Sequence, residues 1–550
     1  MTSARAQNPS SRLLTWIVLM CSAGALLFWN LGTSYLWQDE AATAVLAERM
    51  LRFTRPLAYD GVNLITIDHS AAEGANNIDQ RTHDPQSAIN FYVQRGDLKK
   101  DTVWKWQPWG QFVVAAASLK LLGATTLAAR LPFAIAGIIT VLLLYEFALK
   151  YFEGVQVALL TCIFLIFNSY WILHSRQCRY YALSSLFLIV TLATYARWQR
   201  GGRASAALFV MAAWCWFQVD YGTVWPVLGV LFIDAFFADR RRLWRPLLIG
   251  AVLATSIAPF AYYYELWKRL SVQDGTWSQR FLLNLFNANE YVVPLVIGGA
   301  AAAIMVHRRK TLPVLERRLI SIVCGIFLAL LFWIPSVAPA PFLRYLIATA
   351  PLGCLLVAWV LVRLSDTVFR GFACAVAAIY VFTPCLSLPL HALPIQQRDV
   401  TILRAELLAL GRNVFRHAPD PNRLVIEWLK ESVKSSDEIL INYEDIPLMF
   451  YLPNPIRGGI AVFRAEDDSK KPPDFVVLRR SADFGHWAVY EREMQRYSWE
   501  PIEIHAPDIR CGICADPIAQ EHRDRGYNPA DAPSIFLGRR VSGEEARNVF

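Results

Sequence analysis

The stretch from Leu13 to Leu31, followed within a few residues by Trp37-Gln38-Asp39-Glu40, decides how this chain folds. The first part is an apolar run close to the roughly 20 residues that a membrane-spanning helix needs. It follows a short basic N-terminus, Met1 to Arg12, and has no clear small-residue cleavage site, so we expect a retained first helix. The two adjacent carboxylates are then expected to lie at a membrane surface.

Asp39 and Glu40 allow two compatible interpretations. An Asp directly before a helical pattern can cap the helix by accepting hydrogen bonds from the free backbone N–H groups of the first turn. A carboxylate beside an apolar boundary is also partly desolvated, which increases its basicity and makes it suitable as a general base. The spacing alone favours the cap.

The composition is that of a polytopic membrane protein. Of the 550 residues, 55% are hydrophobic and 18% are charged, and the apolar residues occur in long blocks. Two polar regions, 32–107 and 391–550, separate or follow these blocks and are expected to contain the chemistry or the recognition. The formal charge of +9 is dispersed as short clusters, so it indicates topology and no nucleic-acid partner.

Further segments of spanning length follow the first one, and together they make about eleven transmembrane helices. They lie at about 128–149, 154–173, 180–197, 204–219, 222–238, 246–264, 290–306, 319–335, 344–362 and 371–389.

The short basic loops orient these helices, because Lys and Arg in short loops stay on the cytoplasmic side. With the N-terminus inside, the cytoplasmic loops contain Lys150, Arg197, Arg200, Arg203, Arg240, Arg241, Arg242, Arg245, Arg308, Arg309, Lys310, Arg317, Arg318, Arg363 and Arg370. The first polar loop and the C-terminal region are then outside.

Two helices are expected to lie along the outer membrane interface instead of spanning it. Trp109 to Gly123 is short for a span, and counting it as one would place all later arginine clusters outside. Trp104 and Trp106 precede it at the expected depth of the lipid headgroups. Asp39 to Phe53 has an amphipathic helical pattern and is the second interfacial helix.

The C-terminal region has the composition of a soluble α/β domain. We therefore divide the chain into a transmembrane module, 1–390, whose first outer loop is 32–127, and an outer domain, 391–550. The apolar patterns in the outer domain predict helices at 423–433 and 446–451 and strands at 438–442, 475–478, 502–504 and 535–537.

Two residue patterns outside the membrane segments fall short of a complete metal site. Cys511 and Cys514 form a lone CxxC on the outer side, where a local disulfide is favoured over a thiol redox pair or half of a metal site. A divalent cation could bind in the first loop, although solvated loop residues are the better interpretation of that group. The group consists of Asp68, His69, His83 and Asp84.

Several cations are expected on the outer side. In the stretch from His174 to Tyr181, a helical arrangement would place Arg176 and either Arg179 or Tyr180 on one face, where they could bind a phosphate. Contact with lipid headgroups is an equally good explanation. Other outer cations, which singly are better explained as solvated surface, are Arg130, Lys268, Arg269, Arg280 and Arg344 beside Tyr345.

An ordered series of motifs resembles the polytopic GT-C glycosyltransferases. It is similar in particular to the branch that contains bacterial protein O-mannosyltransferase-like proteins and the lipid A aminoarabinose transferase. The series covers roughly residues 10–390. It consists of Asp39-Glu40, Trp106-Gln107-Pro108-Trp109, Leu122-Gly123, Ala129-Arg130-Leu131-Pro132, Arg176-x-x-Arg179-Tyr180-Tyr181-Ala182-Leu183, and Arg344-Tyr345-Leu346 with Pro351.

The resemblance implies transfer of a sugar from a polyprenyl-phosphate donor to an acceptor hydroxyl, with inversion, at the outer face of the bacterial cytoplasmic membrane. It makes Asp39 the leading candidate for the general base and gives Glu40 a supporting role. The donor phosphate would be bound by Arg176, Arg179, Tyr180, Arg344, Tyr345, Lys105 and Arg130, and the acceptor by Asp60, Gln107 and Trp109. No cofactor is firmly implied.

Two departures from the family pattern concern the first outer loop. Where the aminoarabinose branch has a lysine before the proline, this chain has Gln107, with Lys105 two residues earlier. The insert from Asp60 to Thr102 lies where acceptor selection is expected. The sugar stays open, as does the acceptor, which can be a protein, lipid A or another polysaccharide. A transporter or flippase for a lipid-linked sugar and a non-catalytic envelope assembly protein remain as alternatives.

Overall fold

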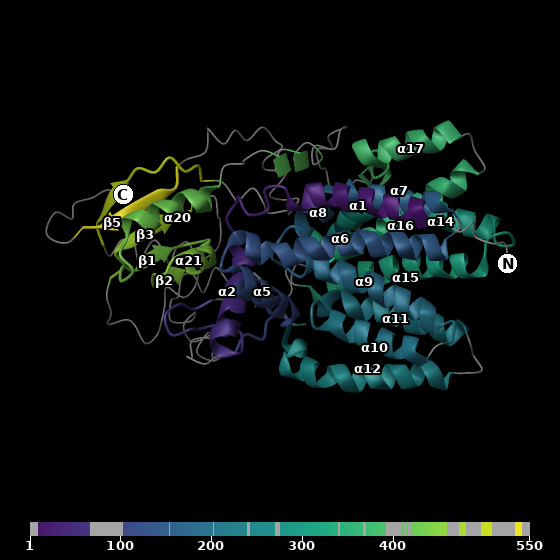
Figure 1. Ribbon diagram of the computed structural model, residues 1–550, viewed down its shortest axis with the longest axis horizontal. Coiled ribbons are helices and arrows are strands. Elements are labelled where there is room, and N and C mark those ends of the chain that lie inside the picture. The colour runs from purple at the N-terminus through teal and green to yellow at the C-terminus, as the bar shows by residue number, and fades with distance from the viewer. Residues whose placement is uncertain are drawn as a thin grey trace. The chain divides into compact units, whose positions relative to one another are not determined.

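The computed structural model forms two compact units, which we describe separately (Figure 1). The membrane unit comprises Met1–Trp29, Leu131–Leu266 and Thr276–Phe415, and the polar unit comprises Asn30–Arg130, Trp267–Gly275 and Arg416–Phe550. The first outer loop is thus grouped with the C-terminal region. The structure describes residues 9–65, 103–152, 154–201, 203–238, 243–269, 276–338, 342–366, 370–391, 407, 410–411, 414–415, 420–458, 472–479, 497–508 and 534–541.

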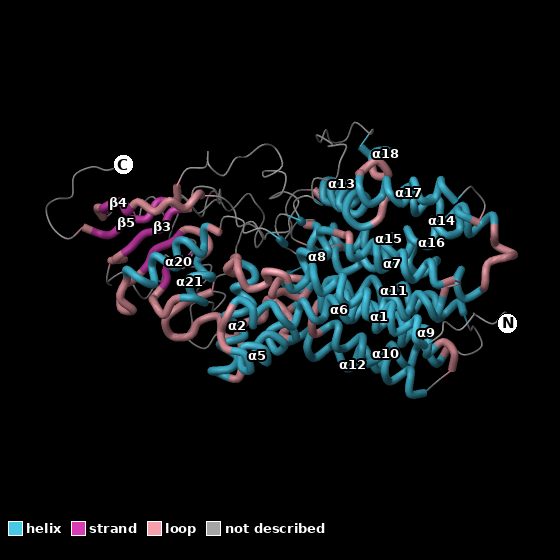
Figure 2. The backbone as a smooth tube through the Cα atoms, turned by 45° about the horizontal axis from the view of Figure 1, so that its top comes forward, coloured by secondary structure: helices cyan, strands magenta, loops and turns pink. Residues whose placement is uncertain are grey.

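Apolar helices build the membrane unit, as Figure 2 shows. By length and composition, six of the described helices can cross a membrane, or up to eight if each of two bent pairs is one span. The helices are α1 (Pro9–Phe28), α6 (Thr126–Tyr151), α7 (Val155–Ile166), α8 (Ser169–Ser175), α9 (Tyr181–Trp198), α10 (Arg203–Phe217), α11 (Tyr221–Ala238), α12 (Trp244–Tyr263), α13 (Trp277–Asn287), α14 (Leu295–His307), α15 (Val314–Val337), α16 (Ala350–Ser365), α17 (Arg370–Phe382) and α18 (Leu388–His391).

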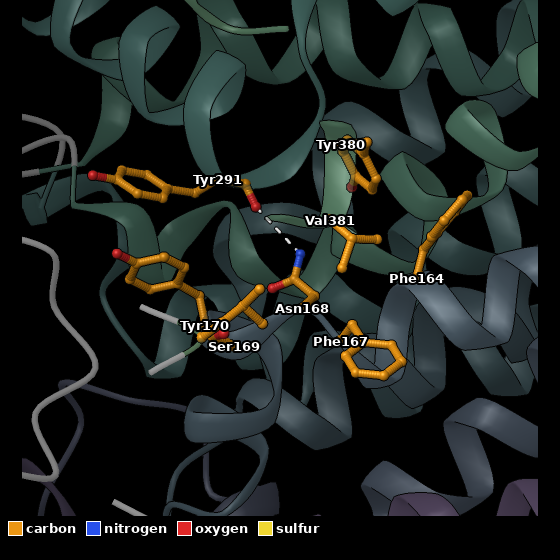
Figure 3. A pocket seen from close by; sticks show the side chains of 9 residues that line it. Phe164, Phe167, Asn168, Ser169, Tyr170, Tyr291, Tyr380 and Val381 are labelled. Atoms are coloured by element: carbon orange, nitrogen blue, oxygen red, sulfur yellow. Dashed lines mark hydrogen bonds between the residues drawn. The ribbon is translucent and has the colours of Figure 1, made fainter. Parts of the chain in front are cut away.

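A predicted span, 154–173, is broken in the structure into α7 and α8, which meet at an angle of 69°. Asn168 stops the first helix and starts the second, because its side-chain oxygen accepts a hydrogen bond from Trp171 N at 2.9 Å. Its amide nitrogen donates to Tyr291 O at 3.4 Å (Figure 3). This break borders a cavity of about 20 Å³, enough for about one water molecule.

The predicted span at 290–306 also begins later than its apolar pattern suggests. Helix α14 starts at Leu295. The π-helix Ala288–Val292 continues α13, and the stretch Trp277–Val292 that they form meets α14 at a bend of 77°. The residue before a proline avoids the helical region of the backbone, and Val293, before Pro294, is extended with φ −153° and ψ 118°. Proline therefore separates the two helices.

Five of the arginines that are predicted to share one membrane face make contacts that link several helices at one end of the membrane unit, namely Arg12, Arg200, Arg308, Arg318 and Arg363. The start of α1 contacts the end of α6, and the end of α6 contacts the segment that follows α9. Helix α9 also contacts α11 and α15. The contacts are Arg12 with Glu146, Arg200 over the Tyr151 ring, Arg318 with Asp234, Tyr195 and Gln199, Arg363 with Glu316, and Arg308 with Asp366. Which membrane face this end occupies stays a prediction.

In the polar unit, α2 (Gln38–Phe53) and α5 (Gly110–Leu122) pack on each other. Helix α2 buries every residue from Thr43 to Ala47, so its buried surface is wider than the single stripe that the amphipathic pattern predicts, and Leu51 of that pattern is exposed. Helix α5 has 13 residues, which corresponds to about 20 Å at 1.5 Å per residue and is too short for a bilayer core of about 30 Å. It ends at Gly123, whose positive φ of 85° suits glycine.

The C-terminal part of the polar unit is the predicted small α/β domain. Its sheet has the order β2-β1-β3-β5-β4, in which β1 is parallel to β2 and β3 while β5 is antiparallel to β3 and β4. Sequence patterns missed β2, and the strand predicted at 502–504 lies earlier in the chain, as β4 at Trp499–Ile502. The elements are α20 (Pro421–Ser432), β1 (Ile439–Ile441), α21 (Asp445–Tyr451), β2 (Ile456–Gly458), β3 (Phe475–Leu478), β4 (Trp499–Ile502) and β5 (Phe536–Arg540).

Candidate functional site

Asp39 lies in the first turn of α2 and does not cap the helix. The N-cap residue is Trp37, in an extended conformation and without a side-chain capping bond, so the cap interpretation of Asp39 is wrong. Asp39 is the second residue of the helix and is half-buried. A carboxylate at this position interacts favourably with the positive end of the helix dipole.

Glu40 and Arg130 form a buried ion pair that fixes the loop before α2. Arg130 donates from Nε and Nη2 to the two Glu40 carboxylate oxygens at 2.8 and 2.7 Å. The guanidinium also donates to the backbone oxygens of Leu31, Ser34 and Tyr35 at 2.8–3.2 Å. The Glu40 side chain is fully buried and Arg130 is 3% exposed. These contacts support a structural role for both residues, in place of catalysis for Glu40 and phosphate binding for Arg130.

Gln38 attaches the start of α2 to the start of α21. Its amide nitrogen donates to Asp445 Oδ1 at 2.6 Å, and the backbone N–H of Ile446 donates to its oxygen at 3.3 Å. Gly458 makes this packing possible, since a Cβ atom there would lie 1.9 Å from Asp445 Cβ. The residue beside Asp39 is therefore held by the C-terminal domain.

Two further contacts join the segment before α2 to the same domain. The backbone N–H of Leu36 donates to the Tyr451 hydroxyl at 3.0 Å, and the Tyr35 ring stacks on the Tyr451 ring with centroids 4.0 Å apart. The backbone N–H of Tyr35 donates to Asp420 Oδ2 at 2.6 Å. Two successive backbone N–H groups before α2, those of Tyr35 and Leu36, thus donate hydrogen bonds to side chains of the C-terminal domain.

A buried polar cluster, which was not predicted from the sequence, lies at the carboxyl ends of the parallel strands β1 and β3. It consists of Asn422, Glu444, Arg479 and Asp508. Asn422 donates to Glu444 Oε2 at 2.9 Å and accepts from Arg479 Nη1 at 2.9 Å. Arg479 also donates to Asp508 at 3.1 Å. Burial raises the pKa of Glu444 to about 7, against the attraction of Arg479. The run Asn-Tyr-Glu-Asp directly after a buried strand was the signal available in the sequence.

Asp60, which was a candidate for binding the sugar acceptor, forms an ion pair with Arg49 of α2 at 3.1 Å. Burial alone would raise the pKa of Asp60, but Arg49 and the backbone N–H groups of Val62 and Asn63 outweigh it and lower the pKa. Arg49 also donates to the backbone oxygens of Leu57 and Asn63 at 3.0 and 2.7 Å. Asp60 therefore helps to fold the loop after α2.

The remaining candidates of the first loop precede or begin α5. Trp109 Nε1 donates to Trp104 O at 2.8 Å, and Gln111 donates to Gln107 Oε1 at 3.3 Å. Lys105 and Gln107 are both half-buried. The structure thus brings Lys105, Gln107 and Trp109 together with α2 in the polar unit, because α5 packs on α2.

In the membrane unit, the turn between α8 and α9 contains Arg176 and Arg179. This turn is not helical, so the two residues do not share a helix face as the sequence suggested. Arg176 donates to the backbone oxygens of Leu26 and, at 2.7 Å, Trp29, and so places a cation at the negative end of α1. Arg179 is 6% exposed and lies 5.9 Å from the Tyr180 ring centroid.

Arg344 lies in the 3-10 helix Leu343–Tyr345, which is followed by a second one, Ile347–Thr349. The second helix packs on α8 and α9, so Arg344 belongs to the same neighbourhood as the turn that contains Arg179. Arg344 is half-buried over the rings of Phe342 and Tyr345, at 4.3 and 5.7 Å from their centroids. Tyr180 lies near both Arg179 and Tyr345.

Other predicted sites lie outside the described residues. These are the cysteine pair Cys511 and Cys514 and the loop group Asp68, His69, His83 and Asp84. Within the described ranges, no group of three or more His, Cys, Asp or Glu residues could hold a metal ion.

Comparison with known proteins identifies relatives by structure alone. No family model matches the chain, and no curated protein matches its sequence. A crystal structure of ArnT from Cupriavidus metallidurans bound to undecaprenyl phosphate matches with a TM-score of 0.59 and 14% identity, over 97% of this chain and 99% of that one. The apo state of the same protein gives a TM-score of 0.56, 14% identity, and coverage of 96% and 98%.

A third solved structure matches more distantly. It is the archaeal oligosaccharyltransferase AglB from Archaeoglobus fulgidus in complex with an inhibitory peptide and a dolichol-phosphate. The TM-score is 0.50 at 10% identity, over 89% of this chain and 73% of that one. These matches confirm the predicted fold: the chain is a polytopic helical membrane protein of the GT-C type with a small α/β domain.

Proposed function

We propose that this protein is a membrane glycosyltransferase that moves a sugar from a polyprenyl-phosphate carrier to an acceptor hydroxyl. The observation that supports the proposal best is the likeness to ArnT bound to undecaprenyl phosphate, which extends over nearly the whole of both chains. The half-buried Asp39, in the first turn of α2, supplies the carboxylate that such chemistry needs.

The proposed reaction is a single displacement. The Asp39 carboxylate accepts the proton of the acceptor hydroxyl while the hydroxyl oxygen bonds to the anomeric carbon. The bond from that carbon to the phosphate oxygen breaks, so the configuration inverts and the polyprenyl phosphate leaves with the electron pair. Glu40 does not take the proton in this proposal, because its carboxylate is buried in the pair with Arg130.

The leaving phosphate is an anion, so cations stabilise it better than a proton donor does. We assign this role first to Arg344 and Arg179, with Tyr180 and Tyr345 as hydroxyl donors. Arg344 is half-buried and held over aromatic rings, which fixes the guanidinium. Arg176 is assigned a supporting role, since it also donates to the backbone at the end of α1.

The acceptor is assigned to the segment before α5, where Lys105, Gln107 and Trp109 lie. Gln107 in place of a lysine would give this chain a neutral hydrogen-bonding group at that point. The acceptor class stays open between a protein, lipid A and a polysaccharide. We place the reaction at the outer face of a bacterial cytoplasmic membrane, with the N-terminus inside, because five of the arginines predicted to be cytoplasmic make contacts at the end of the membrane unit where α1 begins.

The test is a transfer assay with the purified full-length protein, a panel of undecaprenyl-phosphate-linked sugars, and envelope fractions from a strain that lacks the gene. We expect one donor to be consumed with release of undecaprenyl phosphate and appearance of a product of inverted configuration. If no donor in the panel is consumed while the protein moves a lipid-linked sugar across vesicle membranes, the proposal is wrong and the transporter alternative holds.

A further inference from the structure

A cavity of about 390 Å³ opens between the end of α14 and the start of α15, at the cationic end of the membrane unit. Figure 1 shows these two helices near the end of the unit where the N-terminus lies. Three arginines line the cavity, namely Arg309, Arg317 and Arg318, together with the apolar Val306 and Val314. It thus combines a cationic rim with an apolar wall.

The three arginines differ in whether a carboxylate partner balances their positive charge. Arg318 forms an ion pair with Asp234 at 2.6 Å, and other cations at this end are paired in the same way, such as Arg308 with Asp366. For Arg309 and Arg317, no carboxylate of the described residues lies within ion-pair distance. The Arg317 guanidinium donates from Nη1 to the backbone oxygen of Arg309 at 2.6 Å, so the two residues lie next to each other. Within the described part of the chain, these two neighbouring positive charges have no carboxylate partner.

The apolar wall is open to the surroundings of the unit. Val306 is 78% exposed and Val314 is 71% exposed, although both belong to helices of the membrane unit. Exposed valines at the end of a helix of the membrane unit are suited to contact with a lipid acyl chain. An occupant that satisfies both halves of the cavity needs a negatively charged head and an apolar chain.

We propose that this cavity binds an anionic phospholipid, with its phosphate between Arg309 and Arg317 and an acyl chain along Val306 and Val314. Basic pockets between membrane helices recognise anionic headgroups in this way. A zwitterionic lipid would bring a choline cation to the same two arginines and lose most of the attraction. The inference does not depend on the proposed glycosyl transfer.

The test is native mass spectrometry of the full-length protein titrated with phosphatidylglycerol, in parallel with phosphatidylcholine. We expect one phosphatidylglycerol to be retained at low concentration. Binding should be about thirtyfold weaker in Arg309→Gln/Arg317→Gln, since each arginine contributes about 1 kcal/mol near the surface. Arg309→Lys/Arg317→Lys keeps both charges and should retain most of the binding.

The matched control is Arg200→Gln/Arg308→Gln. It removes two charges from the same end of the unit, from residues that do not line the cavity. Equal loss of phosphatidylglycerol in the control and in the cavity variant would overturn the proposal in favour of unspecific attraction. Equal binding of phosphatidylcholine by the wild-type protein would overturn it as well, because the arginines would then play no part.

Discussion

At the level of single residues, two neighbouring carboxylates have different surroundings. Glu40 is fully buried and bonded through both oxygens to Arg130, whereas Asp39, one position earlier in α2, is half-buried. A general base must reach the proton that it accepts, so the half-buried residue suits that task and the buried one does not. The family resemblance ranks Asp39 above Glu40, but the ion pair that buries Glu40 could not be predicted, because its partner is 90 residues away.

We expect Glu40→Gln to destabilise the protein strongly. The substitution leaves the Arg130 guanidinium buried without its counter-charge, which costs about 3–5 kcal/mol. A fall in the midpoint of thermal unfolding of the purified protein measures this effect. The control is Glu427→Gln, which removes an exposed pair with Arg423 and should cost at most about 1 kcal/mol. Similar midpoints for the two variants would contradict the structural role of Glu40.

The buried Glu444 predicts a pH dependence of stability. Its pKa in the folded protein is raised from 4.5 to about 7 by burial, so the folded state binds a proton more tightly than the unfolded chain. This contribution to stability is complete below about pH 4.5 and is lost as the pH rises to about 7. We expect Glu444→Gln to remove it, which thermal unfolding between pH 4.5 and 7 can measure. An unchanged slope in the variant would refute this assignment.

At the level of elements, α2 is held at its start by the C-terminal domain. Gln38 bonds to Asp445 and Ile446 of α21, and Leu36 bonds to Tyr451 at the end of the same helix. These contacts define the direction of α2 and therefore the position of Asp39. We therefore expect the C-terminal domain to contribute to the candidate site by positioning Asp39.

Gln38→Ala is expected to reduce kcat for the proposed transfer by about 10- to 100-fold with a smaller change in KM. The reason is that a displacement of about 1 Å of a catalytic group can cost that much. Steady-state kinetics with varied donor measures it, and Arg52→Gln, an exposed residue in the last turn of α2, is the control. A change in KM alone would point to donor binding instead of positioning.

The sequence predicted the positions of the helices better than the interruptions within them and the long-range contacts between them. Long apolar segments are required by the thickness of a bilayer, so the helices of the membrane unit could be located from composition. The break before α8 depends on Asn168, whose amide finds its acceptor at Tyr291, 123 residues away. The contact of Gln38 with Asp445 joins residues 407 positions apart. No local pattern contains such pairings, so the candidate site was predicted only in part.

At the level of the whole molecule, the first outer loop and the C-terminal domain form one compact unit. The sequence predicts a different division, with 32–127 in the transmembrane module and 391–550 as a separate domain. The grouping follows from contacts such as Asn63 Nδ2 to Asn454 O at 3.1 Å and Ile456 N to Asn63 Oδ1 at 2.7 Å. Asn63 thus adds its side chain to the edge of the sheet at β2.

We therefore expect that removing residues 391–550 abolishes the proposed transfer and loosens α2. Amide hydrogen exchange of α2 should become faster in the truncated protein, because the contacts of Leu36 and Gln38 are lost. Membrane insertion, measured by fractionation, serves as the control that the remaining helices fold. Transfer at the wild-type rate by the truncated protein would show that the domain has no part in the site.

The most direct test of the central claim is the rate of sugar transfer by Asp39→Asn, measured with the purified protein under single-turnover conditions and compared with Glu48→Gln on the same helix. We expect a loss of about 10²- to 10⁴-fold for Asp39→Asn, which is the usual contribution of a general base, with donor binding retained. Glu48→Gln should transfer at close to the wild-type rate. Transfer by Asp39→Asn at the rate of Glu48→Gln would contradict the account.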